Sequence, residues 1–183
     1  MLWYIADWIP TIDRVQQARA YQAAFDQWER VCGLNFDQTT EREAANFLIG
    51  TRMIDGEGGT LAEHQLPHND QQLRGWFDVG DKWTTKHPHG QDVIDLVAVA
   101  THEFGHGIGL PHSTTPGNLM LPFYDPAVRV PMGNDIYEAQ RRYGKPEQPP
   151  EPVPEVDYPV LITMASGNEF PVLKPNLSNW GEA

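Results

Sequence analysis

The chain of 183 residues carries 25 acidic against 13 basic side chains, a formal net charge of −12, and 40% of its residues are hydrophobic. An acidic balance of this size argues against nucleic acid or an anionic membrane surface as a partner. One cysteine excludes an internal disulfide, and no apolar run is long enough to insert into a membrane. The length predicts one main domain with additional segments.

The first half of the chain predicts one strand, one helix and then a series of short strands. Residues 2–9 alternate weakly between apolar and polar, and a helix is expected to begin after Pro10, with Thr11 or Asp13 as its N-cap. Its core-facing stripe follows three- and four-residue steps: Val15, Ala18, Tyr21, Phe25, Trp28 and Cys32. Further strands are expected near residues 34–37, 45–52, 60–66 and 74–79.

The second half predicts two helices and then a change of composition. A helix is expected over residues 91–108, an irregular segment over 110–133 and a last helix over 134–143. Prolines dominate residues 145–159, which predicts an extended linker. Residues 160–183 are too few for an independent core, so they are either a tail docking on the main domain or the stub of a truncated accessory domain.

One motif, H-E-x-x-H-x-x-G-x-x-H, spans residues 102–112 and predicts a zinc site. Positions four apart share one face of a helix, so His102 and His106 can bind the same ion. Gly109 can adopt a positive φ, end the helix and return His112 as the third ligand. Three protein ligands leave one tetrahedral corner for water, whereas structural zinc sites are closed by four ligands and rich in cysteine.

The residue after the first histidine indicates the chemistry of such a site. Glu103 is expected to take a proton from the water in the open corner as that water attacks a carbonyl, and to pass it to the leaving amine. The zinc ion would polarise the carbonyl and stabilise the oxyanion. This combination predicts hydrolysis of a peptide bond without a covalent intermediate.

The motif and its neighbours resemble the matrixins, a metzincin family of matrix-metalloproteinase-like endopeptidases. Ser113 follows the third histidine, residues 118–124 are similar to the matrixin Met-turn with Met120 beneath the zinc, and residues 134–144 are similar to the closing helix. Over residues 1–144 the resemblance implies an α+β fold with a long N-terminal helix, a zinc helix and a C-terminal helix. Its sheet would be twisted and mostly parallel, with about five strands and an antiparallel edge strand.

The resemblance also implies a substrate cleft. Ala62 would offer backbone hydrogen bonds to an extended peptide from the edge strand, and Pro122 and Tyr124 would form a wall of the S1′ pocket. Ala98 takes the position where a bulky matrixin side chain makes that pocket shallow. An alanine there predicts a deep pocket and a preference for a large apolar P1′ residue.

Two further metal sites of the family differ in how well they match. The calcium loop is similar, and its ligands by that match are Asp55, Gly56, Gly58, Thr60, Asp78 and Asp81; an acidic glycine turn without an ion remains the alternative. The second, structural zinc of the family is expected to be absent, since Glu63 and Trp76 stand at the strand positions and His64 and His68 are offset. His87 and His89 are interpreted as solvated loop residues.

The expected protein is a monomeric, secreted enzyme of the extracellular matrix that acts on proteins or peptides. No signal peptide is seen in this chain, because the stretch of residues 1–7 is too short and too acidic to be one. Three alternatives stay open. The chain could be a catalytically silent binding module on a metzincin scaffold, which would have no need of Glu103. It could hydrolyse a non-protein amide, or it could be an intracellular protease restrained by a partner inhibitor.

Overall fold

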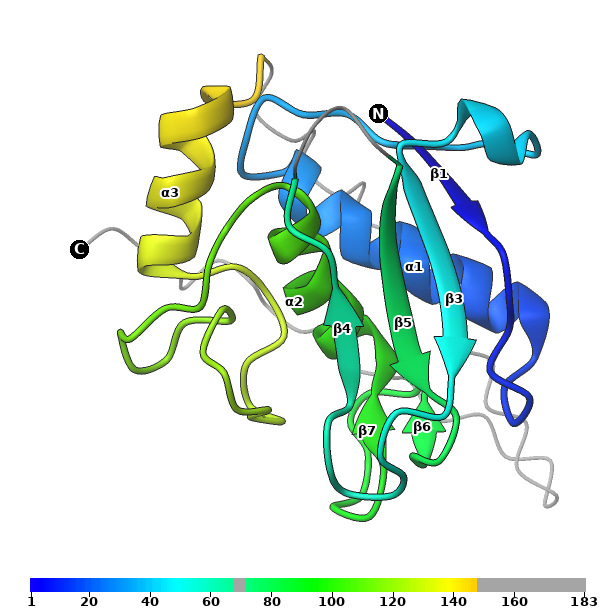
Figure 1. Ribbon diagram of the computed structural model, residues 1–183. Helices are drawn as coiled ribbons and strands as arrows, with labels where there is room; N and C mark the ends of the chain where they lie inside the picture. The colour runs from blue at the N-terminus through cyan, green and yellow to red at the C-terminus, as the bar shows by residue number, and fades with distance from the viewer. Residues whose placement is uncertain (68–71, 148–183) are drawn as a thin grey trace, which may run out of the picture. The chain divides into compact units, whose positions relative to one another are not determined.

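A five-stranded sheet and the helices that cover it make up residues 1–67 and 72–147, the part of the chain that the computed structural model describes (Figure 1). The elements in chain order are β1 Leu2–Ile5, α1 Arg14–Glu29, β2 Asp37–Gln38, the 3₁₀ turn η1 Arg42–Ala44, β3 Phe47–Arg52, β4 Ala62–His64, β5 Leu73–Asp78, β6 Trp83–Thr84, β7 Ile94–Asp95, α2 Leu96–Gly107 and α3 Gly133–Tyr143. His68, the linker beyond residue 147 and the tail 160–183 lie outside the described residues.

The strand order β2-β1-β3-β5-β4 confirms the predicted fold class. β1, β2, β3 and β5 are parallel, and only β4, at the edge, runs antiparallel to its neighbour β5. The central strand β3 has four consecutive buried residues from Phe47 to Gly50, as is typical of an inner strand of a parallel sheet. A separate parallel pair, β6 and β7, leads into the second helix.

The first helix begins where the sequence predicts. Asp13 is the N-cap, and its carboxylate accepts hydrogen bonds from the backbone N–H groups of Val15 and Gln16. The predicted core stripe is correct for Tyr21, Phe25, Trp28 and Cys32 but wrong for Val15, which is 58% exposed. The buried face of α1 begins at Gln17, and Val15, two residues earlier, lies on the other side of the helix.

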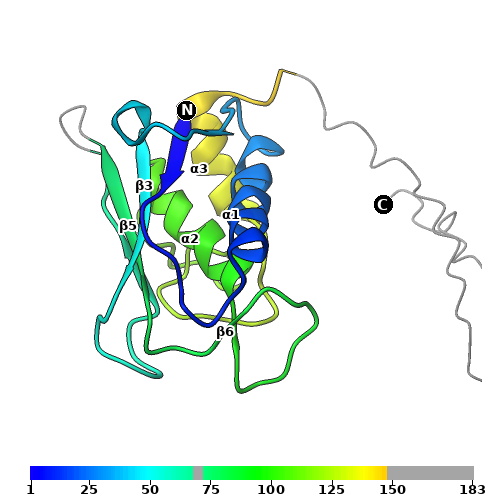
Figure 2. The same ribbon diagram turned by 90° about the vertical axis from the view of Figure 1, so that its right-hand side faces the viewer.

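The helices α1 and α2 pack on each other and cover the same face of the sheet (Figure 2). Phe25 of α1 stacks on Phe104 of α2 with ring centroids 3.9 Å apart and an interplanar angle of 6°. Phe25 also contacts Phe47 of β3, at 5.7 Å. Trp28 donates its indole N–H to the carbonyl oxygen of Thr101 at 2.8 Å, so the first helix holds the second at the residue directly before the metal motif.

The second helix is shorter than the predicted 91–108, because residues 94–95 pair in β7 and Asp95 caps the helix. Gly109 has φ +89°, which confirms the predicted turn after the helix. The last helix, predicted over 134–143, ends at Gly144 with φ +75°. Within the described ranges, no helix combines the length and apolar character needed to span a bilayer.

Candidate metal centre and cleft

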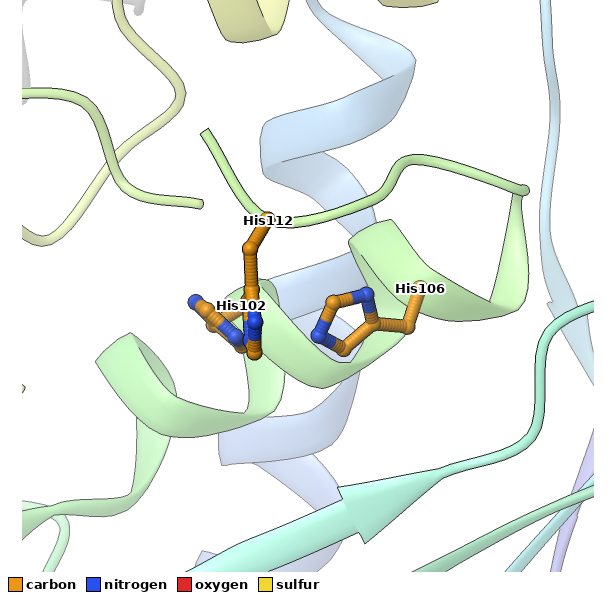
Figure 3. A group of neighbouring side chains, drawn as sticks. All are labelled: His102, His106 and His112. Atoms are coloured by element: carbon orange, nitrogen blue, oxygen red, sulfur yellow. The ribbon is translucent and has the colours of Figure 1, made fainter. Parts of the chain in front are cut away.

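Three imidazoles meet at the end of α2, as the motif predicts. One ring nitrogen from each of His102, His106 and His112 lies within 4.8 Å of the others. Figure 3 shows His102 and His106 on the helix, with His112 reaching toward them from the segment that follows. The ring centroids are 4.7 to 5.3 Å apart, a spacing that lets three nitrogens converge on one ion.

Backbone carbonyls orient two of these rings. Nδ1 of His102 donates to the carbonyl oxygen of Leu119 at 2.8 Å, and Nδ1 of His106 donates to that of Leu110 at 2.7 Å. The Nε2 atoms are then left without a proton and can bind a metal. Burial lowers the pKa of His102 to about 4 and also lowers the pKa of His106, so both rings are neutral near pH 7, as a ligand must be.

Met120 packs against the helix α2 at Gly105. A Cβ on Gly105 would come within 2.4 Å of the sulfur of Met120 and 2.8 Å of the Trp28 ring, so only glycine allows this approach. Asp135 of α3, which is 1% exposed, accepts hydrogen bonds from the backbone N–H groups of Leu119 at 2.7 Å and Met120 at 3.3 Å. Leu119 therefore connects Asp135 to His102: its backbone N–H binds Asp135, and its carbonyl oxygen binds His102.

Glu103 is buried and has an unpaired oxygen. The residue is 6% exposed, and its Oε2 has no hydrogen-bond partner. Burial, and secondarily the negative charge of Glu63, raise the pKa of Glu103 to about 8. A buried carboxyl group without a partner is costly to fold, which points to a role in the cleft rather than in stability. A dication at the neighbouring histidines would favour its ionised form.

The metal centre opens into a cavity of about 680 Å³. His102, Glu103 and His112 line it, and so do all four residues predicted for the substrate cleft: Ala62, Ala98, Pro122 and Tyr124. The hydroxyl of Tyr124 accepts a hydrogen bond from the backbone N–H of Asp95 at 3.1 Å, which ties this wall to the start of α2. Ligand cavities of this size commonly hold small molecules or peptide side chains.

In the predicted calcium loop, backbone N–H groups surround the carboxylates. These carboxylates do not form a group as closely spaced as the three histidines. The Asp78 carboxylate accepts hydrogen bonds from the backbone N–H groups of Ile54, Asp55, Gly56 and Gly80 at 2.7 to 3.2 Å. That of Asp55 accepts from Thr60. Asp81 differs, because its Oδ1 accepts from Gly58 but its buried Oδ2 has no partner.

Glu63 and Trp76, the two strand residues that differ from the family's second zinc site, both contact Arg52. Arg52 of β3 pairs with Glu63 of β4, and its guanidinium lies 4.5 Å above the ring of Trp76 on β5. Beside them, His64 is turned inward between Phe47 and Phe104. Burial lowers the pKa of His64 to about 4, so this ring is neutral near pH 7. Among the described residues, His64 is not part of either group of side chains that could hold a metal.

Sequence reasoning missed several groups that position the site. The carbonyl acceptors of Leu110 and Leu119 leave no side-chain signal. Asp95 could have been recognised from the sequence, since an aspartate directly before an apolar helical run is a capping pattern. Its Oδ1 accepts from the backbone N–H groups of Val97 and Ala98, at 2.8 and 3.3 Å, and its Oδ2 pairs with Arg129.

Comparison of the sequence with known proteins points to one family. The matrixin family model matches residues 1–144. Interstitial collagenase of Bos taurus is 34% identical over 157 residues, and this alignment covers 81% of the chain and 33% of the relative. Stromelysin-3 of Xenopus laevis is 32% identical, covering 90% of the chain and 35% of the relative. Matrix metalloproteinase-16 of Mus musculus is 32% identical, covering 78% and 26% respectively.

The chain therefore spans about a quarter to a third of the length of these relatives. The family match covers both the sheet with its antiparallel edge and the segment that carries the three histidines. The chain belongs to the matrixin family.

Proposed function

We propose that this protein is a zinc-dependent endopeptidase in which Glu103 is the general base. The observation that carries the proposal is the convergence of three imidazoles beside a buried carboxyl group whose Oε2 has no partner, at one cavity. Three neutral nitrogen ligands with an open fourth position are typical of catalytic zinc sites. A silent binding module would not need the buried carboxylate, which lowers its stability.

The metal ligands, the carbonyl groups behind them and Glu103 would each have a separate role. A zinc ion, when bound, supplies Lewis acidity toward a carbonyl oxygen and toward water. His102, His106 and His112 would hold it, and the carbonyls of Leu119 and Leu110 keep the first two rings in the required tautomer. The carboxylate of Glu103 would accept the proton of the attacking water and deliver it to the amine that leaves.

The substrate proposed for this cleft is an extended peptide. β4 ends the sheet, and its outer edge carries Ala62 into the cavity, so a peptide can add to it as a further strand. Ala98 and Tyr124 line the same cavity and would contact the P1′ side chain. Secretion and a monomeric state belong to this proposal and rest on the family resemblance.

Digestion of a peptide library tests the activity directly. We expect cleavage that stops when the protein is treated with 1,10-phenanthroline and returns when zinc is added in slight excess over the chelator. Mass spectrometry of the products identifies the bonds that are cut. Cleavage that is unaffected by the chelator, or no cleavage by protein shown to hold one equivalent of zinc, would contradict the proposal.

The same products report the P1′ preference. The three carbons that distinguish leucine from alanine are each worth about 0.8 kcal/mol on burial, so kcat/KM for a matched peptide with P1′ Leu should exceed that for P1′ Ala by roughly tenfold or more. The measurement is initial rates on two peptides that differ only at P1′. Equal values would show that the cavity beside Ala98 does not receive this side chain.

We also propose that calcium binds at the loop of residues 55–60 through Asp81. Burial raises the pKa of Asp81, and the negative charges of Asp78, Asp55 and Glu57 raise it further, while the backbone hydrogen bond from Gly58 opposes them. Its buried Oδ2 has no partner. A hard cation with oxygen ligands would satisfy this atom and relieve the repulsion.

Calcium should accordingly stabilise the fold. At a hundredfold excess over its dissociation constant, a ligand adds about 2.7 kcal/mol, which for a domain of this size raises Tm by roughly 5–10 °C. Thermal unfolding with calcium and with EGTA measures the shift. Asp81→Asn should lose most of it, and Asp37→Asn, an exposed carboxylate on β2, should keep it. An equal shift in both variants would place calcium elsewhere.

A further inference from the structure

A second group of metal-binding side chains lies beside the cleft. His87, His89 and Asp95 each offer one ligand atom, and these three atoms lie within 4.8 Å of one another. Among residues 1–67 and 72–147, the only other group that meets this spacing is the one formed by His102, His106 and His112. The interpretation of His87 and His89 as solvated loop residues is therefore incomplete: His89 is only partly exposed, and both face a carboxylate that is 2% exposed.

The ligand nitrogens of the two histidines make only weak hydrogen-bonding contacts. Nδ1 of His87 lies 3.5 Å from Oδ2 of Asp95, too far for a good hydrogen bond. Nδ1 of His89 donates to the carbonyl oxygen of Gly90 at 2.7 Å, which leaves its Nε2 without a proton. Within the described part of the chain, that Nε2 has one hydrogen-bonding contact, a long one at 3.4 Å from the hydroxyl of Tyr124. Two imidazoles and one carboxylate suit zinc and similar dications, whereas magnesium and calcium prefer oxygen.

Arg129 competes for this position. Its Nε donates to Oδ2 of Asp95 at 2.6 Å, and a guanidinium so close repels any dication. The Arg129 side chain is 30% exposed, so it can leave toward solvent, whereas Asp95 is held in place through Oδ1 by the first turn of α2. Arg129 and a metal ion would thus bind the same oxygen alternately.

We propose that His87, His89 and Asp95 form a second site for zinc or a similar transition-metal dication, weaker than the three-histidine centre and in competition with Arg129. Tyr124 contacts both His89 and Asp95 and lines the cleft, so occupation of the site alters the wall of the S1′ pocket. This last consequence rests on the proposed function, whereas metal binding itself does not.

The test is a zinc titration of the full-length, untagged Glu103→Gln protein, which should not digest itself. The protein is first loaded with one equivalent of zinc and kept in saturating calcium, so that the three-histidine centre and the loop of residues 55–60 are filled. Calorimetry should then show a second, weaker zinc event that magnesium does not produce. Arg129→Gln should tighten that event about tenfold, because the competing cation is gone.

The double variant His87→Ala/His89→Ala should lose the second event and keep the first equivalent of zinc. Asp92→Asn, an exposed carboxylate of the same loop, should keep both. The proposed site would be wrong if binding of a second zinc ion persisted in the double variant. It would also be wrong if neither the parent protein nor Arg129→Gln bound a second zinc ion. In the protein with Glu103 intact, the second equivalent should reduce hydrolysis of a P1′ Leu peptide, and binding without that change would overturn the link to the cleft.

Discussion

Replacing Glu103 by glutamine should lower kcat/KM by about 10²–10⁴-fold and leave the zinc content unchanged. The amide has the same shape as the carboxyl group but cannot accept a proton, and general base catalysis contributes a factor of this size. It corresponds to about 3–5 kcal/mol of transition-state stabilisation. The fold should not suffer, because a neutral amide of the same size replaces a buried, ionisable group whose Oε2 has no partner. Peptide hydrolysis, metal analysis and urea unfolding of the same preparation measure all three.

Glu43→Gln is the matched control, since it makes the same chemical change at an exposed position of η1. It should retain full activity and one equivalent of zinc. Full activity of Glu103→Gln would exclude the carboxylate as the base. Loss of zinc together with loss of activity would show that Glu103 acts through the metal ligands instead, and no activity in the parent protein would favour the silent binding module.

The sequence predicts the metal centre well because local backbone geometry determines it. The spacing of His102 and His106 follows from the helical repeat, and Gly109 provides the positive φ that brings back His112. The strand positions were predictable to within a few residues for the same reason, since buried parallel strands are continuous apolar runs. The resemblance to a family added the order of strands and the cleft, which periodicity alone does not provide.

What the sequence did not predict depends on contacts between distant segments. Asp95 meets Arg129 across 34 residues, and Trp28 meets the carbonyl of Thr101 across 73. No local pattern encodes such pairs. Val15 was predicted to be buried because it is apolar, whereas the buried face of the helix begins at a polar residue, Gln17. His87 and His89 were predicted to be solvated because their partner, Asp95, follows a turn whose path is set by the pairing of β6 with β7.

Asp135→Asn should destabilise the fold by about 2–3 kcal/mol and weaken zinc binding by about 10–100-fold. The buried carboxylate accepts hydrogen bonds from the backbone N–H groups of Leu119, Met120 and Met132. An asparagine of the same size must turn an N–H₂ group toward at least one of these donors, which leaves buried groups unpaired at about 1–3 kcal/mol each. Urea unfolding of the zinc-free protein measures the stability.

The effect on zinc follows from Leu119, whose N–H is held by Asp135 while its carbonyl oxygen orients the ring of His102. Loss of a group that orients a metal ligand typically costs 10–100-fold in affinity, which competition with a chromophoric chelator measures. Asn134→Ala, the exposed neighbour on α3, should change the free energy of unfolding by less than about 0.5 kcal/mol and leave zinc affinity unchanged. If Asp135→Asn lowers stability but not zinc affinity, Asp135 supports only the fold, and the path through Leu119 to the metal is wrong.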